Sequence, residues 1–380
     1  MEKELSIVTY IRGHGLDKAV ADFKLKSRDY GHKVLIKYDQ IESNMALEEV
    51  QDCRGLILEK GTWKVMCLSF RKFFNNQEGH AANIDWDTAT VLEKLDGSMI
   101  QVYYDWVVDK WFPATTGTGE GEGEVNNKLG LTFEDLFWNT IDEKYAMSKD
   151  LWHKLFNRDH CFVFELTTPY NIVVKPHGES SVALLACRNV KTLQEVNYNA
   201  LLLLGETFNL PVVKSYDLNK GNFGHILKTF ETMLWDEEGY VVVDGNFNRV
   251  KCKNPAYVAA HHLKSKTAAH HILTIVKTNE IEEYAATFPD RKDEIDKLKE
   301  SYDTLVMNLS NIWETLQEHK PKNITPKEQK KFAMKVFELA GKDALVKSFS
   351  GLFFALKDGK ATSVKEYMHE YDNKRLYEIL

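Results

Sequence analysis

Hydrophobic and polar positions follow two different patterns along the chain. Up to about residue 253, short apolar runs with β-branched and aromatic residues recur, and such runs are typical of buried strands. These runs lie at residues 34–36, 55–58, 102–104, 161–164, 182–185 and 240–243. A helical stretch at 132–138 lies between two of them. The pattern predicts that this part of the chain mixes helices and strands.

From about residue 255 onward the strand pattern ends and helical periodicity replaces it. Thr325-Pro326-Lys327-Glu328 is a capping-box start with proline at the first helical position. We therefore predict an α+β domain at residues 1–254 and an all-α C-terminal domain at 255–380. The helical stretches are 256–276, 281–318, 326–340, 344–357 and 363–379, with interruptions at 288–290 and at Pro321.

One short segment carries the strongest chemical signal. Lys94 precedes Asp96-Gly97, and strand-like runs lie at 89–92 and 99–104. Asp-Gly between two such runs predicts a hairpin turn, which would hold the lysine at a strand end. A neutral amine held there can attack an electrophilic phosphorus atom. Taken alone, the same residues also fit a surface hairpin with an exposed lysine.

Acids and cations recur at other strand-like positions. Glu165 lies inside an apolar run and Glu238 precedes Gly239 and another one. A buried carboxylate is costly unless it is paired or faces a cleft, which favours a site. Lys251 and Lys253 alternate on one face of a short strand and could hold a polyphosphate, although a solvated edge is the alternative. Further cations are Arg54 and Lys72.

Composition narrows the class of protein. The chain has 380 residues, of which 43% are hydrophobic and 28% charged, and no apolar run approaches the length of a membrane span. Five scattered cysteines without Cys-x-x-Cys spacing predict reduced thiols in a cytoplasmic protein, with neither zinc site nor disulfide framework. A net charge of −7 argues against non-specific coating of nucleic acid but permits a local basic cleft.

The glycine-rich run at 117–124 has neither phosphate-loop spacing nor a favourable charge. Its glutamates Glu120, Glu122 and Glu124 would repel phosphate. The run predicts a flexible hairpin tip or a lid.

In their order along the chain, these motifs resemble those of the covalent nucleotidyltransferase superfamily of polynucleotide ligases and capping enzymes. The closer resemblance is to the bacteriophage tRNA-repair RNA ligase family, the type-one RNA ligases. It implies an adenylation domain of antiparallel sheets with flanking helices, followed by a helical RNA-specificity domain. The motifs that carry the superfamily resemblance are Lys94-Leu95-Asp96-Gly97, Phe164-Glu165-Leu166, Glu238-Gly239-Tyr240-Val241 and Val250-Lys251-Cys252-Lys253. Those that add the family are Tyr38-Asp39, Cys53-Arg54-Gly55, Lys72-Phe73-Phe74-Asn75, Thr168-Pro169-Tyr170-Asn171, Lys331-Phe332-Ala333-Met334 and Gly351-Leu352-Phe353-Phe354-Ala355-Leu356.

The resemblance implies a three-step reaction. Lys94 attacks the α-phosphate of ATP and becomes a lysyl-AMP phosphoramidate, with release of pyrophosphate. The AMP then passes to the 5′-phosphate of an RNA, and a 3′-hydroxyl attacks that end and expels AMP. The expected partner is RNA with 5′-phosphate and 3′-hydroxyl ends, either single-stranded or a nicked tRNA, and the expected place is the cytoplasm, of a host cell if the protein is viral.

The resemblance also implies roles for individual residues, together with Mg²⁺ or Mn²⁺ bridging the phosphates. In the implied assignment, the ATP phosphates and ribose are held by four cations, Arg54, Lys72, Lys251 and Lys253. Glu165 and Glu238 orient the ribose or metal-bound water, and a further metal-binding acid is Glu280 or Glu282. The nucleotide is bordered by Tyr38 and Val241, and Asp96 belongs to the same nucleotide site. The chain departs from the family pattern at two positions. Thr116 replaces a usual basic residue, and Ile172 replaces a usual arginine.

Two other classes compete with an RNA ligase. A DNA ligase or a GTP-using capping enzyme would share the chemistry, but those enzymes usually append a small β-barrel where this chain turns helical. A non-catalytic RNA-binding protein with a decayed pocket would not be expected to retain Lys94 with all its partner residues.

Overall fold

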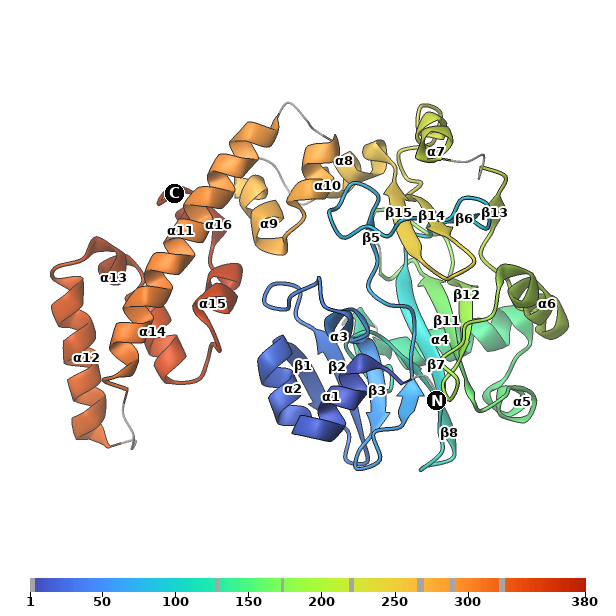
Figure 1. Ribbon diagram of the computed structural model, residues 1–380, viewed down its shortest axis with the longest axis horizontal. Coiled ribbons are helices and arrows are strands. Elements are labelled where there is room, and N and C mark those ends of the chain that lie inside the picture. Colours follow the sequence, from blue (N-terminus) through green and yellow to red (C-terminus); the bar gives the residue numbers. More distant parts are fainter. Residues whose placement is uncertain are drawn as a thin grey trace. The chain divides into compact units, whose positions relative to one another are not determined.

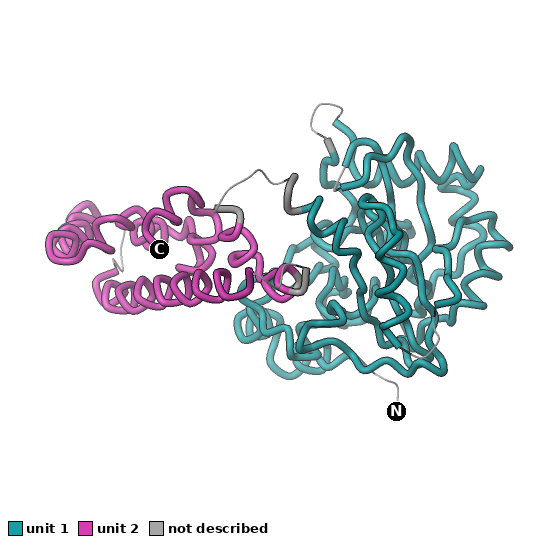
Figure 2. Tube along the Cα trace, turned by 90° about the horizontal axis from the view of Figure 1, so that it is seen from above, with its two compact units in different colours: residues 1–264 teal, residues 265–380 magenta. Residues whose placement is uncertain are grey.

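The computed structural model describes residues 4–126, 130–171, 174–218, 222–264, 270–287, 291–320 and 325–380. The chain divides into two compact units, Met1–Lys264 and Ser265–Leu380 (Figure 2). The first unit contains every strand of the described chain and the second contains helices (Figure 1). The α+β class with a helical C-terminal part is therefore confirmed.

The strands and helices of the two units have the following bounds. The strands are β1 (Leu25–Asp29), β2 (Lys33–Tyr38), β3 (Arg54–Glu59), β4 (Val65–Cys67), β5 (Phe74–Asn75), β6 (Thr90–Glu93), β7 (Ser98–Asp105), β8 (Lys110–Ala114), β9 (Glu124–Asn126), β10 (Leu131–Thr132), β11 (His160–Thr167), β12 (Ser181–Asn189), β13 (Ser215–Tyr216), β14 (Gly239–Val243) and β15 (Arg249–Lys253). The helices of the first unit are α1 (Ser6–His14), α2 (Leu16–Phe23), α3 (Glu48–Gln51), α4 (Phe133–Tyr145), α5 (Lys149–Leu155), α6 (Tyr198–Phe208), α7 (Phe223–Thr229) and α8 (Pro255–Lys264). Those of the second unit are α9 (His270–Thr278), α10 (Ile281–Thr287), α11 (Lys292–Gln317), α12 (Pro326–Ala340), α13 (Ala344–Ser348), α14 (Ser350–Lys357), α15 (Val364–Glu370) and α16 (Asn373–Tyr377).

The strands of the first unit form three main sheets. The first sheet has the order β1-β2-β3-β4, the second β12-β11-β7-β8 and the third β13-β6-β14-β15-β5, while β9 and β10 make a separate pair. Neighbouring strands are antiparallel except for β15 and β5, which are parallel. The predicted antiparallel architecture is thus correct.

The second sheet is covered on both faces. Phe137 of α4 and Trp152 of α5 pack with Phe164 of β11 in one large buried cluster. On the opposite face, Ile57 of the first sheet and Tyr103 of β7 belong to another buried cluster. Because successive strand residues point to opposite faces, neighbouring β7 residues contribute to different clusters, with Tyr104 in the first and Tyr103 in the second.

The third sheet is covered by helix α7 on one face. Tyr240 and Val242 of β14 are buried in a cluster with Ile226 of α7. The intervening Val241 points to the opposite face and is only half-buried. Alternation along the strand therefore leaves the second face of this sheet available for a site.

The predicted hairpin at Asp96-Gly97 is wrong. Strand β6 pairs with β13 and β14 in the third sheet, whereas β7 pairs with β8 and β11 in the second. Residues 94–97 therefore connect two sheets. The Asp96 carboxylate, which is 5% exposed, accepts hydrogen bonds from the backbone N–H groups of Val174 and Lys175 at 2.9 and 2.6 Å. These long-range partners favour the crossing over a local turn, and a Cβ on Gly97 would lie 2.5 Å from the carbonyl oxygen of Leu166.

The compact units divide between residues 264 and 265, whereas the predicted domain boundary is between 254 and 255. Helix α8 belongs to the first unit. The buried Asn254 side chain donates to the carbonyl oxygens of Leu234 and Glu237 and accepts from the N–H of Ala256, so it ties the start of α8 to the preceding loop. Tyr257 is buried as well. Helical periodicity in a sequence predicts that a segment forms a helix, but it does not predict which unit that helix packs against.

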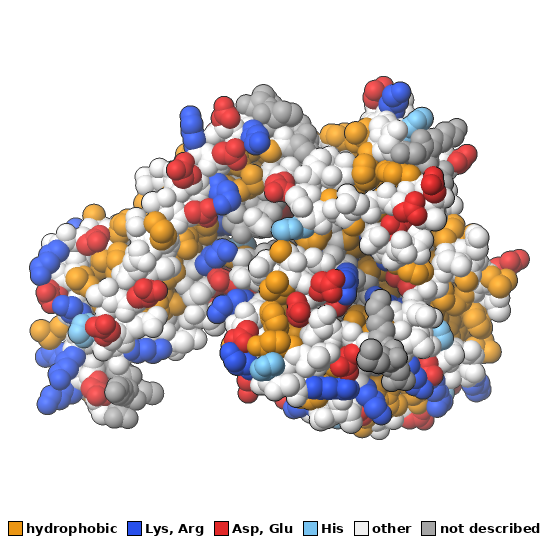
Figure 3. Space-filling model, in the orientation of Figure 1, with side chains coloured by type: hydrophobic (Ala, Val, Ile, Leu, Met, Phe, Trp, Pro, Cys, Tyr) orange, Lys and Arg blue, Asp and Glu red, His pale blue; other side chains and the backbone are white. Residues whose placement is uncertain are grey.

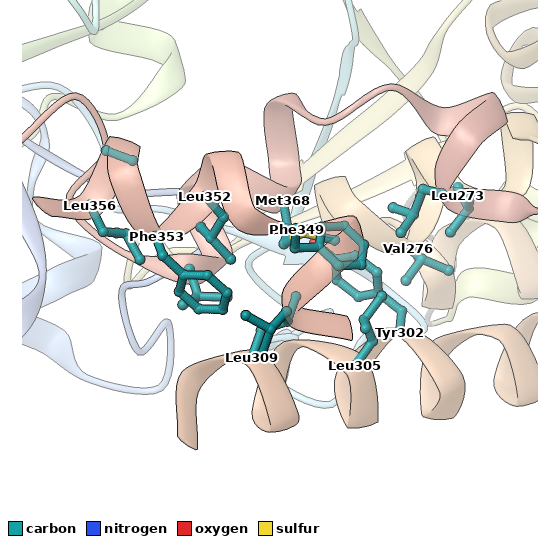
Figure 4. Close-up of a cluster of buried hydrophobic side chains, with 14 of the residues drawn as sticks. Leu273, Val276, Tyr302, Leu305, Leu309, Phe349, Leu352, Phe353, Leu356 and Met368 are labelled. Carbon is teal, nitrogen blue, oxygen red and sulfur yellow. The ribbon is translucent and has the colours of Figure 1, made fainter. Parts of the chain in front are cut away.

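The second unit is built around a single apolar cluster. Leu305 and Leu309 of α11 pack with Phe349, Phe353 and neighbouring side chains (Figure 4). Its α12 begins as predicted, with the Thr325 hydroxyl accepting from the N–H of Glu328 at 3.4 Å and proline at the first position. The predicted helical stretch at 256–276 is described as α8 up to Lys264 and as α9 from His270, and residues 265–269 between them lie outside the described residues. The predicted breaks at 288–290 and Pro321 lie outside the described residues.

Across the described parts of the chain, none of the helices combines the length and the apolar character that crossing a bilayer would require.

Candidate active site

A pocket that is partly open to solvent lies between the second and third sheets. Leu92 and Val241 line it from the third sheet, and Met99 and Glu165 line it from the second. Lys94, on the connection between these sheets, lines it as well. The crossing that replaces the predicted hairpin is what brings the lysine here.

The Lys94 amine is inside the pocket and paired with an acid. Its Nζ lies 2.6 Å from Oε1 of Glu238, and the two side chains are 19% and 9% exposed. The Lys94 backbone N–H donates to the carbonyl oxygen of Gly239 at 2.9 Å. Main chain and side chain are therefore both held against the start of β14, which is the rigid support that a nucleophile requires.

Gly239 is required at this junction. Its φ is +127°, and a Cβ atom would lie 2.2 Å from the carbonyl oxygen of Cys252. We expect Gly239→Ala to lower the free energy of unfolding by about 2 kcal/mol or more, because backbone strain and a backbone clash add. Urea unfolding measures this loss. Gly61→Ala is the matched control, since Gly61 has φ +87° but open space around it, and it should lose only about 1 kcal/mol. Equal losses would remove the clash from the explanation.

Glu165 is the second carboxylate of the pocket. The pKa of Glu165 is raised to about 7, mainly by burial and also by the Glu238 carboxylate, while the cations of Lys94 and Arg54 oppose the increase. Desolvation disfavours the charged carboxylate and so raises its pKa, whereas the neighbouring cations stabilise the charged carboxylate and offset part of that increase. Glu165 therefore gains or loses its charge near neutral pH, as groups at functional sites often do.

Cations gather along strand β15. Burial, together with repulsion from Lys72, Lys253 and Lys94, lowers the pKa of Lys251 to about 7. This repulsion indicates that the four lysines lie close together. Of the four, Lys94 lines the pocket and the other three do not. On the face shown in Figure 3, basic and acidic side chains are interspersed, in keeping with the net charge of −7. The cationic character at Lys251 is therefore local, and it suits an anionic ligand.

Sequence reasoning missed Arg249. It lines the pocket, and its two terminal guanidinium nitrogens, Nη1 and Nη2, donate to the Glu195 carboxylate. Its guanidinium carbon lies 4.6 Å from the centre of the Phe70 ring. The signal was present, because Arg249, Lys251 and Lys253 alternate along one strand. The Glu195 carboxylate neutralises Arg249, so this residue supports the wall of the pocket.

The apolar floor of the pocket was also missed. Phe70, Phe73, Met99 and Leu185 line it, and they belong to a small apolar cluster of their own. The Arg54 guanidinium lies over Phe73, 5.2 Å from the ring centre. Flat apolar walls beside cations suit a nucleotide, whose base is apolar on its faces and whose phosphates are anionic.

The remaining predicted residues lie in three places. The Lys72 Nζ lies 5.5 Å from the centre of the Tyr38 ring, so Tyr38 lies beside one of the four lysines described above. Asp96 anchors the loop at Val174 and is not among the lining residues. Glu280 and the exposed Glu282 belong to the second unit, so their metal assignment stays a prediction.

Two departures from the expected pattern can be located only in part. Thr116 lies in a turn that follows β8. Ile172 lies outside the described residues.

The carboxylates fit a magnesium ion that keeps most of its own water. Among the described residues, no group of three or more His, Cys, Asp or Glu side chains is placed to hold a metal ion by itself. Glu165 lines the pocket, and the Glu238 carboxylate beside Lys94 raises the pKa of Glu165 through charge repulsion. Mg²⁺ is usually bound by one or two carboxylates together with substrate phosphates, and this pair could supply those ligands.

Antiparallel sheets meet here at a lysine, two carboxylates and a row of cations, an arrangement that suits an anionic nucleotide. Comparison with known sequences identifies the family. The sequence profile of the RNA ligase family matches residues 52–257, which is more than half of the chain. The chain belongs to the RNA ligase family.

Individual relatives come from viruses. The RNA ligase of Rhodothermus phage RM378 is 28% identical over 383 residues, covering 86% of this chain and 84% of that protein. A putative bifunctional polynucleotide kinase/RNA ligase of Autographa californica nuclear polyhedrosis virus is 26% identical over 316 residues, covering 77% of this chain and 43% of that protein. Among solved structures, an archaeal ATP-dependent RNA ligase superimposes with a TM-score of 0.48 at 11% identity, over 88% of this chain and 90% of that one.

Proposed function

We propose that this RNA ligase consumes ATP and joins 5′-phosphate and 3′-hydroxyl RNA ends through lysyl-AMP and RNA-adenylate intermediates. The observation that carries the proposal is the Lys94 amine, which lies in the pocket 2.6 Å from Glu238. Family membership supports RNA as the polymer, and the row of cations beside an apolar floor supports a nucleoside triphosphate as the second substrate.

The pocket residues would divide the first step between them. The neutral Lys94 amine attacks the α-phosphorus, a P–N bond forms, and the bond from phosphorus to the pyrophosphate oxygen breaks. Glu238 is placed to take the proton that the amine loses, because the two groups are already within hydrogen-bond distance. Lys251 neutralises charge on the departing pyrophosphate, and such preorganised charge is the main source of catalysis in phosphoryl transfer.

The later steps reuse the same groups. An oxygen of the RNA 5′-phosphate displaces Lys94 from the AMP phosphorus, and the amine regains its proton. The 3′-hydroxyl then attacks the RNA 5′-phosphorus and expels AMP. A bound Mg²⁺ or Mn²⁺, which Glu165 and Glu238 would hold, supplies neutralisation of phosphate charge.

We also propose that the second unit selects the RNA, with an anticodon-loop break in tRNA as the substrate to test first and the cytoplasm of a host cell as the setting. RNA is recognised largely through its shape and its unpaired bases, which a separate helical unit can read.

Labelled ATP tests the proposed reaction. The protein is incubated with Mg²⁺ and ATP labelled at either the α- or the γ-phosphate, and it is then separated on a denaturing gel. Acid-labile label from the α-position only is expected. Label from GTP but not from ATP would move the protein to capping chemistry. Preferential sealing of nicked DNA over single-stranded RNA would contradict the proposed polymer.

We expect ATP binding to weaken as the pH rises above about 7. Lys251 loses its positive charge and Glu165 gains a negative charge through this range, because their pKa values are both about 7. Both changes repel phosphate, so each unit of pH should cost up to about tenfold in affinity for each group involved. Calorimetry in two buffers of different ionisation heat measures the affinity and the accompanying proton uptake. Glu165→Gln and Lys251→Met should each remove one of the two contributions to the pH dependence of ATP affinity. Adenosine, which has no phosphate, should bind independently of pH.

A further inference from the structure

The glycine- and glutamate-rich loop after β8 is held at several points, in contrast to the predicted flexible tip or lid. Lys33, which is 0% exposed, places its Nζ 2.9 Å from Oδ2 of Asp105 and 2.9 Å from Oε1 of Glu120. The Phe112 ring centre is 3.9 Å from the same Nζ, and His32 also contacts Asp105, at 2.7 Å. A buried lysine is stable only when its charge is compensated, so Lys33 clamps Glu120 to the first sheet.

A second set of bonds holds the next part of the loop. The Tyr30 hydroxyl donates to the Glu122 carboxylate, and Arg28 forms an ion pair with it at 3.0 Å. The Gly119 N–H donates to the Tyr30 oxygen at 2.6 Å, and the Tyr103 hydroxyl donates to the Gly119 carbonyl at 2.9 Å. Two of the glutamates that would repel phosphate are therefore neutralised by cations of the first sheet.

These anchored residues follow and support the Thr115–Thr118 turn, which lies against strand β3. The turn is closed by the Thr115 N–H, which donates to the Thr118 carbonyl at 2.9 Å, and by the two threonine hydroxyls at 2.8 Å. A Cβ on Gly55 would lie 2.9 Å from Cα of Thr116, so strand β3 and the turn are in close contact. The next residue back along β3 is Arg54, which lines the pocket. The turn therefore contacts the β3 residue that follows Arg54, although the turn residues themselves are not among those that line the pocket.

A half-buried lysine faces this turn. Lys37 pairs with Arg54 across the β2–β3 ladder. Its Nζ would be 3.5 Å from a Cβ built on Gly117. Within the described ranges no carboxylate forms an ion pair with Lys37, and no hydrogen bond engages the Thr116 hydroxyl. An uncompensated, half-buried cation beside a free hydroxyl is costly unless an anion completes the arrangement.

We propose that Lys37 and the Thr115–Thr118 turn form a phosphate-binding subsite next to Arg54, and that Lys33 acts as its positioning residue. The ligand class is a phosphate group with at least two negative charges. Both the pyrophosphate part of ATP and the 5′-phosphate of an RNA carry such a group. The inference rests on the proposed function for its substrates, but its test measures binding and needs no turnover.

The test compares phosphate probes on the full chain. The unaltered protein and Lys37→Met are titrated with inorganic pyrophosphate and with a short RNA that carries either a 5′-phosphate or a 5′-hydroxyl. We expect Lys37→Met to weaken one phosphate probe by about tenfold, the size of effect typical of a charge-assisted hydrogen bond. Loss of pyrophosphate binding assigns the subsite to ATP, and loss of the preference for 5′-phosphate assigns it to RNA.

The matched control is Lys64→Met, an exposed lysine at the edge of the same sheet, which should change neither affinity. If Lys37→Met binds both phosphate probes as tightly as the unaltered protein does, the subsite is refuted. It is also refuted if the unaltered protein itself binds neither pyrophosphate nor a 5′-phosphate in preference to a 5′-hydroxyl. Absence of protein-linked AMP in the unaltered protein would refute the proposed function and leave these binding results standing.

The positioning role has its own variant. Lys33→Met would leave Asp105 buried without its cation and could prevent folding, so Glu120→Gln is the better change, because the Glu120 side chain is 36% exposed. Glu120→Gln should keep the fold. It should weaken binding of the same phosphate probe that Lys37→Met affects, by about threefold, because one of the two ion pairs to Lys33 is lost. Unchanged affinity in Glu120→Gln would remove Lys33 from the proposal.

Discussion

Lys94→Ala should leave no protein-linked label after incubation with α-labelled ATP and Mg²⁺. The P–N bond requires the ε-amino group, and no other amine of the described chain is paired with a carboxylate inside the pocket. Loss of a covalent nucleophile removes the step itself, so the decrease should reach the detection limit, about 10³-fold or more. A denaturing gel with acid treatment measures it.

A second substrate separates loss of the nucleophile from loss of the fold. RNA whose 5′ end already carries AMP bypasses the first two steps, and Lys94→Ala should still seal it measurably, because the 3′-hydroxyl is the nucleophile there. Lys175→Ala is the matched control, since Lys175 lies near this region with only a 3.7 Å contact to Asp236. It should be labelled normally. Label on Lys94→Ala at the level of the unaltered protein would place the nucleophile elsewhere.

Lys251→Met should change activity and stability in opposite directions. It removes a cation that would neutralise the departing pyrophosphate, which should slow formation of lysyl-AMP by about 100-fold. The same substitution removes a charge that burial and three neighbouring lysines disfavour. The unligated protein should therefore unfold about 2–4 °C higher, corresponding to roughly 1 kcal/mol for a domain of this size.

The gain in stability should depend on pH with a definite sign. The folded-state pKa of Lys251 is about 7, against an ordinary value of 10.5. The folded protein thus binds fewer protons than the unfolded chain between these values, and the penalty from Lys251 decreases as the pH rises through this window. Lys251→Met should stabilise the protein most at pH 7 and least near pH 10. Scanning calorimetry at both pH values measures this, with the exposed Lys228→Met as control. A destabilised Lys251→Met would contradict the inferred electrostatic penalty.

Much of the site could be predicted because it depends on local pattern. Val241, Glu165 and the lysines of β15 lie on strands whose alternation is visible in the sequence, so their faces follow once the strand is identified. Phe70, Phe73 and Met99 were missed for the converse reason. An apolar residue has the same appearance in a core and in the floor of a pocket, and only the packing of other segments distinguishes the two.

The hairpin at Asp96-Gly97 is the most instructive error. Asp-Gly between two strands favours a local turn, but the observed connection is stabilised by hydrogen bonds to Asp96 from residues far along the chain, Val174 and Lys175. The loop at Glu120 shows the same effect, because its partner Lys33 lies almost ninety residues earlier. In both cases, hydrogen bonds or ion pairs with residues far along the chain outweighed the local conformational preference.

By itself, the sequence determined which chemical groups this protein has and in which order they occur, because strand alternation and short motifs depend on neighbouring residues. It also determined that the chain changes from mixed structure to helices near residue 255. Only the tertiary structure decided that Lys94 crosses between two sheets to meet Glu238, that α8 stays with the first unit, and that the acidic loop is neutralised by Lys33. These outcomes depend on the free energy of pairing segments far apart in the chain, and no local pattern of residues encodes it.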